Sequence, residues 1–352
     1  MKIAPLMAAM QRKPQLQATL VHTGQHYDAA MSQTFFDELG IPKPDLNLEV
    51  GSGSHASQTA QIMVRFEEVL LARRPDLVLV VGDVNSTLAC SVTAAKLEVP
   101  VAHIEAGLRS FDRSMPEEIN RIVTDVVSSL LFTTSAEADA NLLGEGIPPD
   151  RIHRVGNVMI DSLLHALEEA DRSPILSTLG IRPQGYALVT IHRASNTDPD
   201  HPETLRDILS GLGEVQRRIP LVFPIHPRTR KALETFGLRE QADAMSRLTL
   251  IDPVGYFDSI KLQKEARLVI TDSAGLQEET TALGIPCLTV RENTERPETV
   301  SVGTSTLVGT RPEVIVREAT RVLDGTYKQG RIPDLWDGHA AERIVEVLRT
   351  KM

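Results

Sequence analysis

The sequence predicts an α/β protein with two doubly wound parallel sheets. Short, apolar, β-branched runs alternate with longer stretches of helical period along the 352 residues, and the runs are apolar on both faces. Strands of this kind belong to parallel sheets that helices cover on both sides. There are eight such runs, which exceed one comfortable sheet of this type. We therefore expect two Rossmann-like domains facing a cleft.

The eight expected strands fall into two groups along the chain. They are residues 19–22, 77–81, 99–104 and 130–133 in the first group, and 187–191, 221–225, 268–271 and 287–290 in the second. Charged residues cluster with Pro174, Gly180 and Pro183 between the groups, as in a connecting segment. This pattern predicts an N-terminal domain over residues 1–157 and a nucleotide-binding C-terminal domain over 158–337. A last helix, 338–352, is expected to pack back on the first domain.

The composition excludes several classes of protein. With 41% hydrophobic and 24% charged residues, the chain is a folded rather than a disordered protein. The net charge of -10 argues against nucleic acid or an anionic membrane as the main partner. Cys90 and Cys287 are too few and too distant for a disulfide framework or a zinc motif, so a reducing cytoplasm is expected.

The chain gives no sequence signal for a membrane. No apolar run approaches the roughly 18 residues that a membrane span requires. The first ten residues imitate a signal peptide, but the apolar run is short and no small-residue cleavage site follows. We expect a helix there instead.

Acidic residues follow two strands of the first group. Ligands of open parallel sheets bind beyond the carboxyl ends of the strands. Asp83 follows the strand at 77–81, and Glu105 lies at the end of the next strand, with Arg109 nearby. Asp83 alone could simply cap a helix. Two carboxylates at neighbouring strand ends favour a site that separates acid and base roles.

A third acid begins the following helix. Pro116 suits the first helical turn, and Glu117 comes directly after it. A glutamate there complements the positive end of a helix, so this position is explained equally well without a catalytic role.

Basic residues follow the strands of the second group. His192 and Arg193 end one strand, and His226 and Arg228 end the next. A single histidine at a strand end is usually structural, but two histidine and arginine pairs in one sheet form a basic rim. Arginine forks suit phosphate oxygens, so the rim predicts an anionic ligand.

The strand at 268–271 leads into a tight turn of small residues and a helix. Ser273 and Gly275 lie where backbone N–H groups can hold an anion, and Glu279, one turn into the helix, could accept from ribose hydroxyls. Arg296 lies in a charged loop after the next strand, on the same ligand side.

One motif points elsewhere and is rejected. Residues 51–56 match the dinucleotide-binding fingerprint, and Asp76 lies at the sequence separation expected for the acidic residue that binds the ribose. Asp76 precedes a strand, whereas that acid should follow one. We therefore expect no nicotinamide site.

Six segments, in order, resemble the non-hydrolysing UDP-N-acetylglucosamine 2-epimerases. They are residues 23–28, 82–87, 103–109, 116–121, 272–279 and 294–298. The resemblance implies a glycosyltransferase-B type fold, a homodimer, and interconversion of UDP-N-acetylglucosamine with UDP-N-acetylmannosamine. UDP would leave by elimination to give 2-acetamidoglucal and then add back. No metal or redox cofactor is implied.

The resemblance also assigns roles to individual residues. Asp83, Glu105 and Glu117 match the family's acid and base carboxylates, and His192 matches its catalytic histidine. The positions that match or adjoin its nucleotide-binding residues are Arg193, His226, Ser273, Gly275 and Glu279. Gln25 and His26 lie in a segment that binds an activating second substrate molecule in some members.

The chain departs from the family pattern at its start. Family members begin with a strand and a Gly-Thr-Arg-Pro-Glu loop, whereas this chain opens at Met1, and Lys2 resembles the lysine that follows that loop. We expect Met1 to be an internal methionine of a longer reading frame. Without that loop, binding of a nucleotide sugar without turnover is one alternative. A hydrolysing epimerase or a glycosyltransferase on the same fold is another.

Overall fold

The computed structural model describes residues 1–24 and 38–351, which divide into two compact units. Unit 1 comprises Met1–His165 and Asp334–Met352, and unit 2 comprises Ala166–Pro333. The division falls inside the helix α7 (Val158–Arg172), rather than in front of it as the sequence suggested. This helix begins in unit 1 and ends in unit 2.

The described residues of unit 1 form two parallel sheets, ordered β1-β2 and β3-β4-β5-β6. Besides the start of α7, its described elements are α1 (Ile3–Gln11), β1 (Val21–His22), β2 (Leu46–Asn47), α3 (His55–Arg73), β3 (Val78–Val81), α4 (Asn85–Lys96), β4 (Val101–Ala106), α5 (Pro116–Val127), β5 (Leu130–Thr133), α6 (Ala136–Gly144), the 3₁₀ turn η1 (Pro149–Arg151), β6 (Ile152–Arg154) and α16 (Ala340–Lys351).

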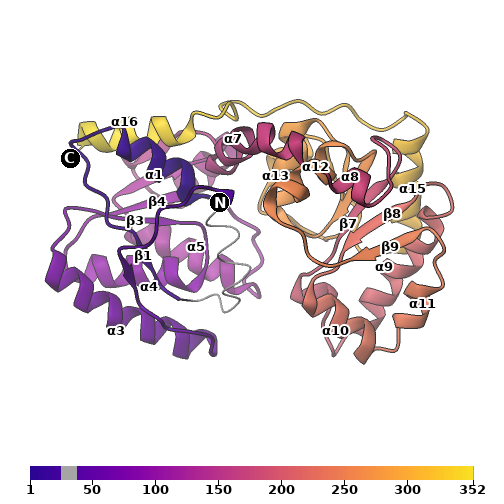
Figure 1. Ribbon diagram of the computed structural model, residues 1–352. Helices are drawn as coiled ribbons and strands as arrows, with labels where there is room; N and C mark the ends of the chain where they lie inside the picture. Colours follow the sequence, from indigo (N-terminus) through magenta and orange to yellow (C-terminus); the bar gives the residue numbers. More distant parts are fainter. Residues whose placement is uncertain (25–37, 352) are drawn as a thin grey trace. The chain divides into compact units, whose positions relative to one another are not determined.

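Helices cover both faces of the larger sheet of unit 1. On one face, Ala102 and Ile104 of β4 pack with Leu6 of α1 and Ile344 of α16. On the other face, Val78 and its neighbours pack against α3 and α4. α16 contacts α1, so the last helix belongs to unit 1 although it follows unit 2 in the chain (Figure 1).

Unit 2 has one parallel sheet with the order β12-β11-β10-β7-β8-β9. Besides the end of α7, its elements are α8 (Ile175–Thr178), β7 (Ala187–Thr190), the 3₁₀ turn η2 (Ala194–Asn196), α9 (Pro202–Val215), β8 (Leu221–Pro224), α10 (Pro227–Thr235), α11 (Arg239–Asp243), β9 (Leu248–Ile251), α12 (Tyr256–Lys264), β10 (Leu268–Thr271), α13 (Ala274–Leu283), β11 (Cys287–Thr289), α14 (Pro297–Ser301), β12 (Ser305–Leu307) and α15 (Pro312–Leu323).

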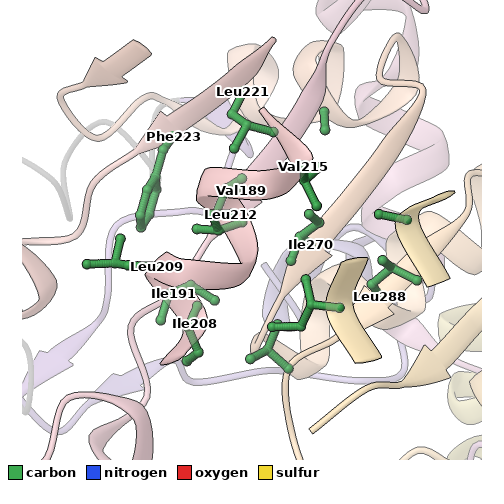
Figure 2. Close-up of a cluster of buried hydrophobic side chains, with 14 of the residues drawn as sticks. Val189, Ile191, Ile208, Leu209, Leu212, Val215, Leu221, Phe223, Ile270 and Leu288 are labelled. Carbon is green, nitrogen blue, oxygen red and sulfur yellow. The ribbon is translucent and has the colours of Figure 1, made fainter. Parts of the chain in front are cut away.

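This strand order is that of a doubly wound Rossmann sheet. The chain fills β7, β8 and β9 on one side and then returns to fill β10, β11 and β12 on the other. The order therefore reverses between β7 and β10, which is where ligands of such sheets bind. Figure 2 shows the core under one face, where Val189 and Ile270 pack with Leu209 and Leu212 of α9.

The expected fold class is confirmed. All eight strands expected from the sequence form, each within two residues of its expected start, and every pairing is parallel. The structure adds four strands that the sequence did not reveal, β2, β6, β9 and β12, and each lies at the edge of its sheet. In the part of the chain that the structure describes, no helix is long and apolar enough to cross a membrane.

Candidate active site

Asp83 and Glu105 lie near each other at the carboxyl ends of β3 and β4, in the larger sheet of unit 1. β3 and β4 pair in parallel with Val81 opposite Ile104, so the chain segments that follow both strands leave the sheet side by side. The Glu105 side chain is buried, and its backbone has a φ of 69°. The pairing of β4 with β5 also shifts register at this residue. A positive φ in a residue other than glycine is sparsely populated and favours a functional origin.

Lys2 is the partner of Glu105. Its Nζ lies 2.5 Å from Glu105 Oε2, and the Glu105 side chain is 1% exposed. The same ammonium group lies over Gly82, where an added Cβ would come within 3.3 Å of Lys2 Nζ. Gly82 also has a φ of 73°, so this turn accepts glycine and crowds any larger residue.

Asp83 pairs with a buried arginine from α5. Arg121 Nη1 lies 2.5 Å from Asp83 Oδ2, and Arg121 Nη2 lies 2.7 Å from Glu118 Oε2. Glu118 also accepts hydrogen bonds from the backbone N–H groups of Ser110 and Phe111. Burial would raise the pKa of Glu118, but these hydrogen bonds and Arg121 hold it below its usual value. Arg121 thus fixes the Asp83 carboxylate and keeps a cation beside it.

Glu117 and Arg109 have different surroundings. Glu117 lies half-buried in the first turn of α5, next to Glu118 in sequence. Arg109 is buried in an ionic network, with Nη1 at 2.7 Å from Asp125 Oδ2 and Nη2 at 2.6 Å from Glu145 Oε2. Burial by itself would lower the pKa of Arg109, but the Glu145 and Asp125 carboxylates raise this pKa above its usual value. Its guanidinium group is therefore engaged with protein carboxylates.

The site of unit 2 lies where the strand order reverses. β7 and β10 pair with Thr190 opposite Thr271, which places His192 beside Asp272. His192 Nδ1 lies 3.0 Å from Asp272 Oδ1, and the same carboxylate accepts from the backbone N–H groups of His192 and Arg193. Burial would raise the pKa of Asp272, but these donors lower it. An ionised Asp272 fixes a proton on His192 Nδ1 and leaves Nε2 for a ligand.

A cavity of about 200 Å³ opens at this point of unit 2. It is lined by Leu188, Thr190, Ile191, His192, Pro224, His226, Pro253, Val254, Ser259, Leu262, Ser273 and Leu276. The expected residues His192, His226 and Ser273 therefore meet at one cavity. Its apolar part suits a flat ring, and its histidines lie at the carboxyl ends of β7 and β8.

The two histidines of the cavity differ in their hydrogen bonds. His226 Nδ1 accepts from the backbone N–H of Arg228, so a neutral His226 carries its proton on Nε2. Desolvation, helped by nearby His192 and Arg228, lowers the pKa of His226. The ring centroids of His192 and His226 are 5.6 Å apart. His226, which lines the cavity, thus carries its N–H on Nε2 when neutral, and its ring lies next to the ring that Asp272 holds.

The arginines expected at this site are held by protein groups. Arg228 Nη1 donates to the His192 carbonyl, and Arg193 Nη2 lies 3.2 Å from Glu295 Oε1. Arg296 is buried, with its Nε 2.5 Å from Glu278 Oε1. These contacts bring Arg193 and Arg228 to the His192 turn, whereas Arg296 lies in a buried ion pair.

Gly275 and Glu279 lie on α13, which starts after Ser273. Gly275 is half-buried in the first turn. Glu279 is buried one turn further on, and it accepts hydrogen bonds from Tyr256 Oη and Gln263 Nε2. Burial raises the pKa of Glu279 to about 7. Neither residue lines the cavity, whereas Ser273 does.

Two expected residues cannot be placed. Gln25 and His26, the residues of the expected second substrate site, lie outside the described residues. Among residues 1–24 and 38–351, no group of three or more His, Cys, Asp or Glu side chains could hold a metal ion.

The residues that hold the expected ones in place were not predicted from the sequence; they are Asp272, Glu118, Arg121 and Asp125. A signal for three of them was present in α5. Its buried face carries Glu118, Arg121 and Asp125 at helical spacing, while Ile119 and Val126 are exposed. A helix whose inward face is charged indicates a built polar site, because buried charges need partners.

Comparisons with known proteins agree with this architecture. The site defines a doubly wound α/β protein with two carboxylates at neighbouring strand ends in one unit and a cavity lined by two histidines in the other. The family model described as UDP-N-acetylglucosamine 2-epimerase matches residues 8–349. The chain belongs to the UDP-N-acetylglucosamine 2-epimerase family, whose members are enzymes, and its fold is of the glycosyltransferase-B type.

Several relatives are similar over nearly their whole length. A UDP-N-acetylglucosamine 2-epimerase of Methanocaldococcus jannaschii is 42% identical over 99% of this chain and 95% of that protein. A UDP-2,3-diacetamido-2,3-dideoxy-D-glucuronate 2-epimerase of Pseudomonas aeruginosa is 44% identical with the same coverage. The crystal structure of the M. jannaschii epimerase with UDP-GlcNAc and UDP superimposes with a TM-score of 0.90 and 41% identity, covering 99% of this chain and 96% of that one.

Proposed function

We propose that this protein interconverts UDP-N-acetylglucosamine and UDP-N-acetylmannosamine. A carboxylate removes the proton from C2 of the sugar, the C2–H electron pair forms the C1=C2 double bond, and the C1–O bond to UDP breaks. The product pair is 2-acetamidoglucal and UDP. Return of a proton to the opposite face of C2 and re-addition of UDP then complete the epimerisation.

One observation carries the proposal. Asp83 follows β3 and Glu105 lies near the end of the adjacent parallel strand β4, and each is paired with a cation from a different element. The C2 proton is weakly acidic, so its removal needs a positioned carboxylate. Removal of the C2 proton from one face of the sugar and return of a proton to the other face need two acid or base groups with different surroundings. Asp83 with Arg121 and Glu105 with Lys2 are such groups, and Glu117 at the start of α5 is a third.

The cavity of unit 2 supports the leaving-group side of the reaction. A departing diphosphate needs hydrogen-bond donors and positive charge. His192 and His226 line the cavity, and the N–H groups at the start of α13 follow Ser273, which lines it too. The apolar lining of Leu188, Val254 and Leu262 suits a uracil ring.

Isotope exchange tests the reaction. UDP-N-acetylglucosamine incubated with the protein in deuterated water should acquire deuterium at C2, and NMR should detect UDP-N-acetylmannosamine. UDP binding without exchange, measured by calorimetry, would contradict turnover and favour a binding protein. Free N-acetylmannosamine with UDP would instead identify a hydrolysing enzyme.

The substrate could also be a modified sugar. The P. aeruginosa relative, whose name gives UDP-2,3-diacetamido-2,3-dideoxy-D-glucuronate as substrate, is as similar as the UDP-N-acetylglucosamine enzymes. The elimination at C2 is the same for both sugars. Values of kcat/KM for the two substrates, measured in parallel, decide between them, and a preference for the diacetamido sugar would replace the first assignment.

We also propose that two copies of this chain associate. Val64 and Leu71 of α3 are exposed and seven residues apart, as are Ile119 and Val126 of α5. Residues seven apart share a helix face, and α4 packs against both helices. Sedimentation should show a dimer that Leu71→Lys weakens. Leu143→Lys, at an exposed position of α6, should leave it intact.

A cytoplasmic location is part of the same proposal. Cys90 and Cys287 are both buried free thiols, as is usual in a reducing compartment. Cell fractionation with the native protein tests the location.

A further inference from the structure

A buried histidine lies between the two carboxylate-bearing strand ends of unit 1. His103 is on β4, and its side chain is 0% exposed. Its Nδ1 lies 2.6 Å from Asp125 Oδ1, and its Nε2 lies 2.9 Å from the carbonyl oxygen of Gly82. A carboxylate and a carbonyl both accept hydrogen bonds. Both ring nitrogens therefore face acceptors.

This arrangement defines the protons on the ring. A neutral imidazole has one N–H, so it would turn a bare lone pair toward one of the two acceptors. A neutral ring could satisfy both contacts only if its own proton were on Nε2 and Asp125 donated a second proton to Nδ1. That arrangement requires a neutral Asp125. Asp125 Oδ2, however, accepts from the Gly107 N–H and lies 2.7 Å from Arg109 Nη1.

Asp125 is therefore ionised. Burial would raise its pKa, but pairing with His103 and Arg109 holds the pKa below its usual value. Arg109 also forms an ion pair with Glu145, so its positive charge is shared between two carboxylates. With Asp125 charged, only a ring with protons on both nitrogens satisfies Asp125 and Gly82 together.

The pair connects three segments that carry the proposed acids and bases. The Gly82 carbonyl belongs to the peptide group that leads into Asp83. Gly107, which donates to Asp125, follows Glu105 by two residues. Asp125 itself lies on α5, the helix that carries Glu117 in its first turn. One ion pair thus contacts the backbone or helix that supports each carboxylate.

We propose that His103 is a positioning residue for the epimerisation, and this inference rests on the proposed function. Its doubly protonated ring, anchored by Asp125, fixes the Gly82–Asp83 peptide group and so the direction of the Asp83 carboxylate. His103 does not contact the sugar. Small displacements of a reacting group are costly, about hundredfold in rate for 1 Å.

Two substitutions separate the contacts of His103. The amide nitrogen of His103→Gln can take the place of Nε2 and donate to Gly82, whereas that of His103→Asn can take the place of Nδ1 and donate to Asp125. Both remove the charge. We expect kcat with UDP-N-acetylglucosamine to be at least about tenfold lower for His103→Asn than for His103→Gln, with KM values within about threefold.

A matched control comes from the same sheet. His153 on β6 is partly buried and contacts the Phe132 ring. His153→Asn and His153→Gln should change thermal stability but leave kcat unchanged. Equal kcat values for the two His103 variants, both folded by circular dichroism, would overturn the inference.

A second measurement needs no turnover. In ¹⁵N-labelled wild-type protein at pH 7.5, the His103 ring, assigned through its correlations with the His103 backbone, should show both nitrogens protonated. A singly protonated ring would overturn the inference even if both variants failed to fold. An inactive wild-type protein would overturn the proposed function instead, and the ring spectrum would still decide the state of His103.

Discussion

The Asp272 carboxylate binds His192 twice, through ring Nδ1 and through the backbone N–H. The ring is thereby held in one orientation and one tautomer. Asp272→Asn keeps the size of the side chain and removes the charge that fixes the Nδ1 proton. We expect kcat to fall about hundredfold with little change in the far-ultraviolet spectrum.

Steady-state kinetics on purified variants checks this expectation. Asp252→Asn is the control, because Asp252 is 89% exposed and pairs with Arg230 at the surface. If Asp272→Asn kept more than about half of the wild-type kcat, His192 would not depend on its carboxylate.

Arg121 should be important for stability. Its side chain and that of Glu118 are each 1% exposed and face each other, so Arg121→Met would leave a buried carboxylate without its cation. We expect a loss of about 3 to 5 kcal/mol in the free energy of unfolding. The double variant Arg121→Met, Glu118→Gln should recover part of that loss. Urea denaturation measures both, and Arg172→Met, at an exposed ion pair, should cost less than about 1 kcal/mol.

Glu279 should make stability depend on pH. Its pKa is about 7 in the folded protein and 4.5 in an ordinary environment, so the folded state binds more protons between these values. The stabilisation that protonated Glu279 gives to the folded state is fully present below about pH 4.5 and is lost as the pH rises through 7. We expect wild type to lose about 2.5 kcal/mol relative to Glu279→Gln between pH 5 and pH 8.

Denaturation at both pH values tests this sign. Using the difference between the two proteins removes the contributions of other groups, such as Asp272, whose lowered pKa acts in the opposite direction. A difference that stays constant with pH would show that Glu279 is ionised throughout.

Gly107 should tolerate no side chain. An added Cβ would lie 2.4 Å from the Ala138 carbonyl oxygen, and the backbone φ is 76°. We expect Gly107→Ala to lower stability by about 3 kcal/mol or more and to lower kcat, because this turn follows Glu105. Gly144→Ala, where no atom lies within 4 Å, should be neutral or slightly stabilising. Equal thermal stability of the two variants would contradict the geometry.

All inner strands and the edge strands β1 and β3 could be predicted from the sequence, whereas the edge strands β2, β6, β9 and β12 could not. β4 and β10 are buried along their whole length and consist mainly of apolar residues. β2 and β6 have only two and three residues and include polar ones, and no residue of β9 is buried, because one side of an edge strand meets solvent or a loop. Register and edge position depend on contacts between distant segments, which no local pattern contains.

The site residues also divide into those that could be predicted from the sequence and those that could not. Asp83, Glu105 and His192 could be found because each follows a predicted strand. Their partners Arg121 and Asp272 act through contacts 38 and 80 residues away in the chain, and only the folded structure reveals those pairings. The placement of Arg109 in a buried ionic network was hidden for the same reason.

The backbone of Glu105 has one more consequence. A residue with a Cβ held at a φ of 69° costs about 1 to 3 kcal/mol, which the surrounding fold must supply. In the proposed reaction, the Glu105 carboxylate is therefore oriented before any sugar arrives, and the incoming nucleotide does not need to reorganise that turn. For the same proposal, a substitution that relaxed the turn should make the protein more stable and the reaction slower.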